Sequence, residues 1–410
     1  MKLLFVMFAP PAPSNAGHRV RNRTLLQALQ AEGHQVSLLC YADAEEMESP
    51  SPELAGLCRD FRLVQMPAQN QIWGRLATLF ARRPYGAIRL ESEAMQAAVA
   101  ETLARESYDA IVCDDVYLLA NLPADTPLPV LLNKHDLTHR IVGQFVRAEK
   151  NVLKKLYGQL EARKIRRLEI EACMEADAVL ACSEWDAELI RRDCPAAKVF
   201  VLPNVVDVES YVPSRGDDGH TVLFVGAMEW LPNRDGVAYF IGDILPKLRA
   251  LVPGVRFLVA GRNPSAEFRA QYAGLADVEF TGTVGEIQDV IAPAAVCVAP
   301  LRMGSGTRLK ILEAAAMGKP VVSTSLGAEG LEFRHGEEIL LAEDSCGFAE
   351  STALLLNRPD LRRTLGEAAR KRVERNYSLI SLRATIAEVL PSVSAASKDC
   401  RQLEHNSLVT

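Results

Sequence analysis

Several short motifs that mark common enzyme classes are missing from this sequence of 410 residues. No G-x-G-x-x-G follows the first predicted strand, and neither a phosphate-binding G-x-x-x-x-G-K-[ST] nor a zinc-binding H-E-x-x-H occurs in the chain. The first absence argues against a nicotinamide-dependent oxidoreductase, because that fingerprint shapes the turn on which the cofactor's pyrophosphate rests. The other two argue against P-loop nucleotide sites and the familiar zinc-peptidase site.

Paired cysteines are also missing. The nine cysteines are scattered along the chain and form no C-x-x-C pair. An odd number of cysteines without metal-binding spacing favours reduced thiols over a disulfide framework or a zinc site. We therefore expect a cytoplasmic protein, and since no cluster of carboxylates suggests an obligatory metal, we expect none.

Long apolar runs and an excess of positive charge are absent as well. No stretch approaches the roughly 20 apolar residues of a membrane-spanning helix. A net charge of −6 argues against a general nucleic-acid binder, which is normally basic. The apolar start of the chain is short and is followed by a helical pattern rather than a cleavage site, so we interpret residues 2–8 as a first strand and not as a signal peptide.

Short apolar segments alternate with helical patterns along the whole chain. This pattern is typical of mostly parallel sheets covered by helices on both faces. A chain of 410 residues exceeds one ordinary core, so two domains are expected. The strands are predicted at KLLFVMF, HQVSLLC, FRLVQM, YDAIVCD, PVLLNKHD, DAVLACS, KVFVLPN, TVLFVGAM, VRFLVAG, VEFTG, AAVCVAP, PVVST and EILLA. The sequence therefore predicts an α/β protein of two doubly wound, Rossmann-like domains.

The break between the domains is predicted at a polar segment that contains glycine and proline. We expect a first domain over residues 1–207, a linker over residues 208–220 and a second domain over residues 221–376. The polar residues 394–410 are expected to form a flexible tail. Ligands of such sheets bind beyond the carboxyl ends of the strands, so two domains that face each other should form a cleft there.

The segment GSGTRLKILEAAAMGKPVVST, residues 304–324, combines a glycine-rich turn with charged residues on an otherwise apolar helix. Gly306 and the preceding glycine allow a tight turn that presents bare N–H groups, and Ser305 or Thr307 can cap the helix. The start of a helix attracts anions. Arg308, Lys310 and Glu313 fit a diphosphate at the mouth of this helix and a ribose diol one turn deeper, although Lys310 and Glu313 could also form only a solvated ion pair.

Four other candidates follow predicted strands. Gly17 opens the first helix and lets backbone amides approach a ligand. His135 follows a buried strand, where an imidazole could bind a sugar hydroxyl or stabilise charge, or could be a structural histidine. Gly226 and Asn233 lie between a strand and the next helix of the second domain. Arg21, in the first helix, could add positive charge but could equally be an ordinary surface residue.

A long basic helix is predicted over residues 138–176. Its lysines and arginines would allow docking on an anionic membrane. Its glutamates, Glu149, Glu161, Glu169 and Glu171, favour instead a solvated face on which the charges pair.

Several segments, taken in order, resemble a known family. They are AGHRVRNRTLLQALQAEGHQVSLL, EADAVLACSEWDAELI, VFVLPNVVDVESYVP, TVLFVGAMEWLPNRDGVAYFIGDILPKL and SGTRLKILEAAAMGKPVVST. Together they resemble the group 1 (family four) retaining glycosyltransferases of GT-B fold, over residues 2–390. GTRLKILEA and GAEGL are similar to elements of bacterial sugar transferases of exopolysaccharide assembly.

The resemblance implies a hexose-type sugar donor of the nucleotide-diphosphate class, bound by the second domain, and no separate cofactor. It implies a glycan or lipid-linked acceptor bound by the first domain, whose determinants we expect in loops such as residues 69–83, with peripheral contact to the inner membrane as a further expectation. Glu313 matches the carboxylate that holds the ribose, Gly17 the glycine beside the diphosphate, and His135 the histidine near the donor sugar. A helix over residues 377–393 matches one that crosses back onto the first domain.

The sequence departs from the family pattern at three positions. Ser305 stands where a first glutamate is usual, GAM stands where an arginine commonly follows the glycine, and Val205 replaces the glycine of P-N-G-V-D. We hypothesise that Arg308 and Lys310 restore the positive charge and stabilise the departing diphosphate. Two alternatives stay open: a GT-B nucleotide-sugar epimerase, and a non-catalytic partner that binds nucleotide sugar, which Ser305 would favour.

Overall fold

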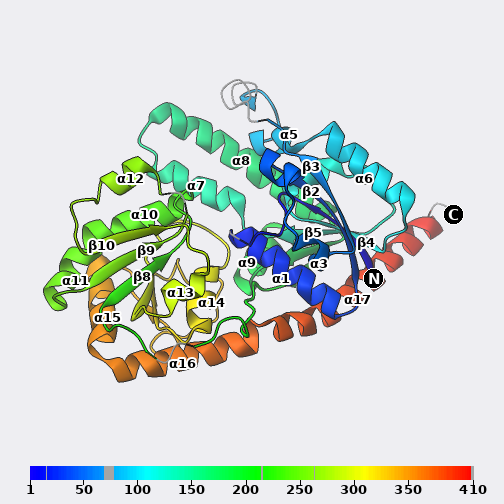
Figure 1. The fold of residues 1–410 in the computed structure, drawn as a ribbon. Coiled ribbons are helices and arrows are strands. Elements are labelled where there is room, and N and C mark those ends of the chain that lie inside the picture. The colour runs from blue at the N-terminus through cyan, green and yellow to red at the C-terminus, as the bar shows by residue number, and fades with distance from the viewer. Residues whose placement is uncertain (15, 69–77, 214–215, 263, 408–410) are drawn as a thin grey trace. The chain divides into compact units, whose positions relative to one another are not determined.

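A computed structural model describes residues 1–14, 16–68, 78–213, 216–262 and 264–407, with side chains as far as residue 393 (Figure 1). The chain forms two compact units. The first comprises Met1–Pro203 with Leu382–Thr410, and the second comprises Asn204–Ser381. Residues 69–77, which include most of the loop expected to bind the acceptor, lie outside the described residues.

The first unit is built on a parallel sheet of seven strands in the order β3-β2-β1-β4-β5-β6-β7. Its strands are β1 (Lys2–Met7), β2 (Gln35–Ala42), β3 (Asp60–Gln65), β4 (Ala110–Cys113), β5 (Val130–Lys134), β6 (Ala178–Ala181) and β7 (Val199–Val201). Its helices are α1 (Gly17–Ala31), α2 (Ala44–Glu48), α3 (Leu54–Leu57), α5 (Tyr85–Leu90), α6 (Glu93–Arg105), the 3-10 helix η1 (Val116–Asn121), α7 (Thr138–Ala148), α8 (Val152–Glu175) and α9 (Glu184–Asp193).

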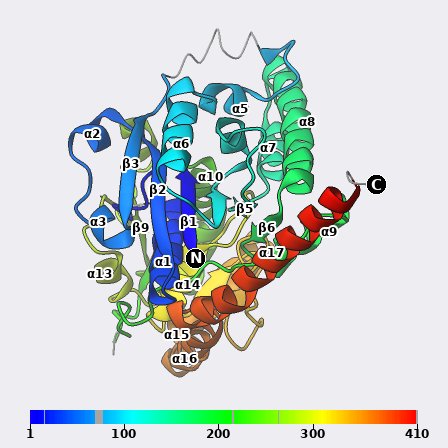
Figure 2. The ribbon, with the colours of Figure 1, turned by 90° about the vertical axis from the view of Figure 1, so that its right-hand side faces the viewer.

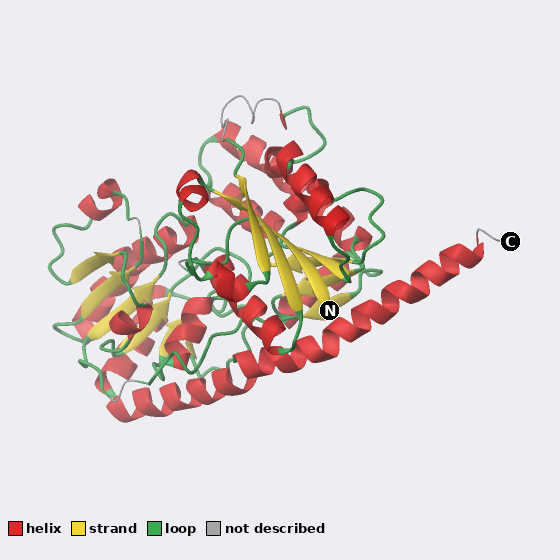
Figure 3. Ribbon diagram, turned by 45° about the vertical axis from the view of Figure 1, so that its right-hand side comes forward, coloured by secondary structure: helices red, strands yellow, loops and turns green. Residues whose placement is uncertain are grey.

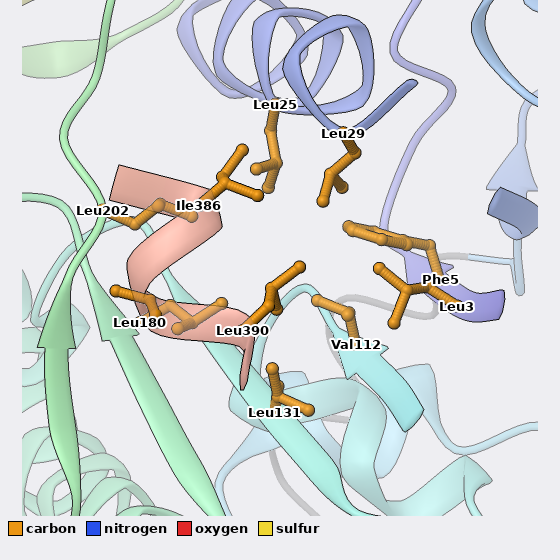
Figure 4. Close-up of a pocket in the computed structure, with 11 residues that line it drawn as sticks. Leu3, Phe5, Leu25, Leu29, Val112, Leu131, Leu180, Leu202, Ile386 and Leu390 are labelled. Carbon is orange, nitrogen blue, oxygen red and sulfur yellow. The ribbon is translucent and has the colours of Figure 1, made fainter. Parts of the chain in front are cut away.

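Side chains of β1 alternate between two apolar layers, as a strand buried on both faces requires. Leu4 and Val6 pack with residues of α6. Leu3 and Phe5 point the other way and line a small apolar cavity together with α1 and α17 (Figure 4). The helix α17 (Leu379–Ser407) contributes Ile386, Val389 and Leu390 to this layer, so part of the C-terminal helix completes the core of the first unit.

The second unit has a parallel sheet of six strands in the order β10-β9-β8-β11-β12-β13. The strands of both units are drawn in yellow in Figure 3. Its strands are β8 (Thr221–Val225), β9 (Arg256–Ala260), β10 (Val278–Gly282), β11 (Val296–Ala299), β12 (Val321–Ser323) and β13 (Leu340–Leu341). Its helices are α10 (Leu231–Tyr239), the π-helix η2 (Phe240–Ile244), α11 (Leu245–Leu251), α12 (Ala266–Ala270), α13 (Ile287–Ile291), α14 (Leu309–Ala316), α15 (Ser345–Asn357) and α16 (Pro359–Asn376). Val222 and Phe224 of β8 face one apolar core and Leu223 faces the other, so helices cover both faces here too.

These two parallel sheets confirm the predicted fold class, but the domain boundary differs from the one expected. The segment expected to be a linker belongs to the second unit, which begins at Asn204. Val208 and Tyr211 pack against its core, and the Arg370 guanidinium donates to the carbonyl of each. An ion pair of 2.8 Å between Arg362 and Asp217 fixes the same segment further on.

Two helices also differ from the sequence-based expectation. The long basic helix is broken into α7 and α8, because Asn151 caps a new helix by accepting a hydrogen bond from the Lys154 backbone N–H at 3.1 Å. The helix α17 continues to Ser407, through much of the segment expected to be a flexible tail. Among the helices of the described part of the chain, none has the length and apolarity needed to cross a bilayer.

Candidate functional site

The glycine-rich turn of the second unit follows β11 and leads directly into α14. Gly304 and Gly306 adopt φ angles of +123° and +75°, in the region that favours glycine. The Thr307 hydroxyl accepts a hydrogen bond from the Asn204 side-chain amide. The turn therefore has a defined shape before any ligand binds.

Arg308 has a different position from the one expected of a diphosphate ligand. It is the residue before α14, and its guanidinium folds back to donate to the backbone carbonyls of Ser305 and Gly306. These two carbonyls attract the guanidinium cation, so Arg308 stabilises the glycine-rich turn from within. In this structure Ser305 contributes its backbone carbonyl to that arrangement.

Lys310, in the first turn of α14, lies where α14 meets α10 and β8. Its Nζ donates to Asn233 Oδ1 of α10 at 2.8 Å and lies 3.9 Å from the centroid of the Phe224 ring of β8. A Cβ atom on Gly226, just past β8, would lie 2.9 Å from Lys310 Nζ and 2.7 Å from Asn233 Nδ2. The glycine is therefore needed because the lysine and the asparagine occupy the space of a side chain.

The charge of Lys310 is poorly stabilised in this half-buried position. Burial, followed by the nearby positive charge of Arg308, lowers the pKa of Lys310 to about 7, while Glu313 acts weakly in the opposite direction. Hydrogen bonding to a neutral amide and contact with an aromatic face do not replace an anion. An anionic ligand that binds here would therefore gain more binding free energy than one that binds an ordinary surface lysine.

Glu313 stands three residues after Lys310 on α14 and is also half-buried. Its Oε1 accepts a hydrogen bond of 3.2 Å from the hydroxyl of Tyr211. Burial raises the pKa of Glu313, and both the Tyr211 hydroxyl and Lys310 oppose this rise. The site thus offers a cation and the first N–H groups of α14 to an anion, and one turn deeper a carboxylate that can accept from hydroxyl groups.

The first unit has a separate network of buried polar groups around Asp114, which directly follows β4. The Asp114 carboxylate is 2% exposed and accepts from Asn22 Nδ2, Asn133 Nδ2 and His135 Nε2, each at 2.7 Å. Arg21 extends the network by donating to Asn133 Oδ1 at 2.8 Å. His135 is therefore held through one nitrogen, and Nδ1 is the nitrogen left for another partner.

Arg21 is not the surface residue that the sequence allowed for. It is 3% exposed, and its guanidinium donates to the Leu202 carbonyl as well as to Asn133. Gly17 is exposed at the first position of α1, one turn before Arg21. The helix therefore presents its glycine start to solvent and anchors its second turn in the network below His135.

Replacing Asp114 by asparagine is expected to lower the kcat of the reaction that the family resemblance implies about tenfold, the effect of losing one hydrogen bond of roughly 1–1.5 kcal/mol. The asparagine cannot accept from all three donors, so His135 loses its fixed orientation. The substitution should lower kcat and leave the affinity for the nucleotide unchanged. Thermal unfolding should show that the variant is folded. If its kcat is nevertheless unchanged, Asp114 does not position His135 for the reaction.

The structure brings Gly226, Asn233, Lys310 and Glu313 together around the glycine-rich turn. Gly17 and His135 belong to the first unit. Sequence reasoning missed Asn204, Tyr211 and Asp114. Asp114 and Asn204 are each the last residue of a predicted strand, which was the available signal, whereas Tyr211 lay in the supposed linker and gave none.

Comparison with known proteins places this geometry in a family. Residues 16–205 match the glycosyl transferase 4-like domain, and residues 219–358 match the glycosyl transferases group 1 family. An uncharacterized 44.6 kDa protein in the cps region of Klebsiella pneumoniae is 24% identical over 362 residues, which cover 85% of this chain and 89% of that protein. Phosphatidyl-myo-inositol mannosyltransferase of Mycobacterium leprae is 30% identical over 224 residues, 52% of this chain and 57% of the relative.

Solved structures of low identity share the fold. Sucrose-phosphate synthase from Thermosynechococcus elongatus superposes with a TM-score of 0.71 at 20% identity, covering 97% of this chain and all of that one. HepE from Anabaena, solved with UDP-glucose, has a TM-score of 0.67 at 16% identity and covers 96% of this chain and 100% of its own. The two family matches together account for most of the chain, which therefore belongs to the glycosyltransferases, with a 4-like domain followed by a group 1 domain, and has the GT-B fold.

Proposed function

We propose that the protein transfers a hexose-type sugar from a nucleotide-diphosphate sugar to a glycan or lipid-linked acceptor, with retention of configuration, in the cytoplasmic synthesis of a cell-surface polysaccharide. The observation that carries the proposal is the half-buried Lys310 beside the turn at the start of α14, with Glu313 one turn deeper. The description of the Klebsiella pneumoniae relative, in a cps region, supports the polysaccharide role. The HepE complex with UDP-glucose supports the donor class.

In the proposed mechanism the bond between the anomeric carbon and the diphosphate oxygen breaks, and its electron pair leaves with the diphosphate. An acceptor hydroxyl oxygen forms the new bond on the same face, and its proton passes to the departing phosphate oxygen. Lys310 and the first N–H groups of α14 stabilise the charge that grows on the diphosphate, the type of effect that dominates many enzymes. Glu313 accepts hydrogen bonds from the ribose hydroxyls.

In the same proposal the two nitrogens of His135 have different roles. Nε2 donates to Asp114, and Nδ1 accepts from a hydroxyl of the donor sugar. Arg308 acts indirectly: it holds the glycine-rich turn and raises the positive potential at Lys310.

The experiment that tests the proposal is a thermal-shift screen with UDP-, GDP-, ADP- and dTDP-sugars, followed by product analysis with and without acceptor. A bound donor raises the melting temperature by mass action. Transfer to an acceptor supports the proposal, whereas epimerised donor formed without acceptor supports the epimerase. Donor binding with no product under any condition supports the non-catalytic partner, the candidate that Ser305 favours.

Donor binding is expected to depend on pH through Lys310. The pKa of about 7 in the free protein must rise when a diphosphate binds, because the anion stabilises the charged amine. Affinity should be highest below pH 7 and should fall up to about tenfold for each pH unit above it. Calorimetry at pH 8 in buffers of different ionisation enthalpy should show proton uptake, and its absence would mean that Lys310 does not meet the diphosphate.

Removal of divalent metal is expected to leave the transfer rate unchanged. In the proposed mechanism Lys310 and backbone N–H groups supply the positive charge that a metal supplies in other transferases. Activity measured after dialysis against EDTA should match that of untreated protein. Loss of activity that added Mg²⁺ or Mn²⁺ restores would contradict this assignment.

A further inference from the structure

The first two turns of α8 carry aliphatic side chains on the solvent side. Val152 is 68% exposed, Leu153 78% and Leu156 58%. Their spacing places all three on one face of the helix. We call these three residues, with Lys150, Lys154 and Lys155, the α8 tip (Figure 1).

The opposite face of α8 is the one that packs against the protein. A Cβ atom on Gly158 would meet Val146 of α7 at 2.5 Å, so the two helices approach closely there, side by side in Figure 2. Ile165 and Ala172 continue the buried side. The aliphatic residues of the α8 tip therefore have no role in this packing, and exposed apolar groups of this kind mark interaction surfaces.

Two of the four glutamates that should neutralise the basic helix are turned inward. Glu161 is 7% exposed and accepts from the Tyr85 backbone N–H at 2.8 Å. Glu169 is 3% exposed and forms a buried ion pair of 2.7 Å with Lys134. The solvated, charge-paired face that we favoured from the sequence is found further along α8, where Arg167 forms an ion pair of 2.6 Å with the exposed Glu171, rather than at the α8 tip.

The α8 tip keeps its positive charge. Lys150 and Lys154 are exposed and Lys155 is half-buried, and Arg147 just before them is exposed as well. Glu149 is the one carboxylate between residues 147 and 156, and its Oε1 accepts from the Asn151 backbone N–H at 2.8 Å. A chain with a net charge of −6 thus has a local surface of opposite sign around exposed aliphatic groups.

A second apolar group lies near this helix. Phe80 is 95% exposed and follows Thr78, whose hydroxyl lies 3.3 Å from that of Tyr157 on α8. The Lys164 amine donates to the Thr78 carbonyl. The chain next to α8 therefore adds an exposed aromatic ring to the same region of the first unit.

We propose that the α8 tip docks the protein on the surface of an anionic lipid bilayer. Aliphatic side chains that enter the boundary between headgroups and acyl chains, flanked by lysines that contact anionic headgroups, are the combination that holds a helix at a membrane surface. The inference deepens the proposed function and rests on it in one respect: a lipid-linked acceptor would be presented at such a surface. A second copy of this chain is a poorer occupant, because its own α8 tip would bring like charges together.

The test is co-sedimentation of the full-length protein with large vesicles, either of phosphatidylcholine alone or of an equal mixture of phosphatidylcholine and phosphatidylglycerol. The parent should bind the anionic vesicles strongly, the neutral ones weakly, and both less in high salt. Each of Lys150→Gln, Lys154→Gln and Lys155→Gln should reduce binding up to about fivefold. The triple variant Val152→Ser, Leu153→Ser, Leu156→Ser should reduce it by tenfold or more.

Matched controls come from the second unit. Ile380 is 72% exposed and Lys371 is exposed, so Ile380→Ser and Lys371→Gln change surface groups of the same kind in the other unit and should bind as the parent does. Absence of binding to anionic vesicles, or equal binding by parent and tip variants, would overturn the proposal. A dimer that the tip variants abolish, without vesicle binding, would also overturn it.

The two proposals can fail separately. Donor binding is measured in solution without lipid, and the tip variants should retain it. Vesicle binding without donor binding would leave the docking surface standing and remove the proposed function, and the reverse result would remove only the docking surface.

Discussion

The Lys310→Met variant is expected to transfer sugar about 10²–10³-fold more slowly than the parent, the effect of removing one preorganised group that stabilises transition-state charge. Methionine preserves much of the apolar length of the side chain over Phe224 but removes the amine that lies 2.8 Å from Asn233. Growing negative charge on the diphosphate would then face only the first N–H groups of α14. The measurement is kcat/KM for transfer with a donor identified by the thermal-shift screen.

The stability of the same variant should change in the opposite direction. A lysine whose pKa is lowered to about 7 makes folding less favourable while it is charged, and methionine removes this cost. The variant should therefore match or exceed the parent in melting temperature at pH 7. The free energy of unfolding of the parent should rise relative to that of the variant as pH increases from 7 toward the pKa of an unfolded lysine. Over that interval the unfolded parent binds more protons than the folded parent does.

Lys319 provides a matched control. It is 4% exposed in the same unit, and its amine donates to the backbone carbonyls of Gly216 and Ala292. Lys319→Met should lower the melting temperature, because it leaves two carbonyls without this donor, but folded protein should turn over as the parent does. If Lys310→Met and Lys319→Met lose activity in proportion to lost stability, the catalytic assignment of Lys310 fails.

The Glu313→Gln variant is expected to bind a nucleoside diphosphate about 10–10²-fold more weakly. A carboxylate that accepts from two ribose hydroxyls contributes roughly 1.5–3 kcal/mol through each charge-assisted hydrogen bond, and the amide keeps a single neutral acceptor. The change retains the shape of the side chain beside Tyr211. Calorimetric titration with the nucleoside diphosphate of the preferred donor measures the effect.

Inorganic pyrophosphate separates the two assignments. It has no ribose, so Glu313→Gln should bind it as the parent does, whereas Lys310→Met should bind both ligands weakly. A buried carboxylate that serves only structure is the control: Glu338 is 5% exposed and forms ion pairs with Arg334 and Arg372. Glu338→Gln should lose stability and keep its affinity for both ligands, and equal losses at Glu313 and Glu338 would contradict the ribose assignment.

The fold followed from periodicity, because buried parallel strands are short, apolar and separated by helices. Helices on both faces of each sheet were expected once the strands were placed, whereas the order of the strands came only from the structure. The domain boundary was harder to predict, since the polar residues 208–220 have the composition of a linker. Val208 and Tyr211 pack into the second core through contacts with α16, which is distant in the sequence.

The candidate site was predicted in part. Positions after strands identified Gly226, Asn233 and Lys310, because the carboxyl ends of parallel strands meet at one edge. The direction of a charged side chain was not predictable in the same way: Arg308 and Lys310 are two residues apart, yet one donates to its own turn and the other reaches Asn233. Asp114 was missed because it acts only through partners on α1, β5 and the residue that follows β5.

The central claim is that the glycine-rich turn and Lys310 receive a pyrophosphate group, and titration of inorganic pyrophosphate into parent and Lys310→Met protein at pH 6.5 tests it most directly. The pH lies below the pKa of about 7, so the amine is mostly charged before the ligand arrives. Binding by the parent that weakens about 10²-fold or more in the variant is the expected result, in line with the loss of one strong charge-assisted contact. Equal binding by the two proteins, or none by the parent, would contradict the claim.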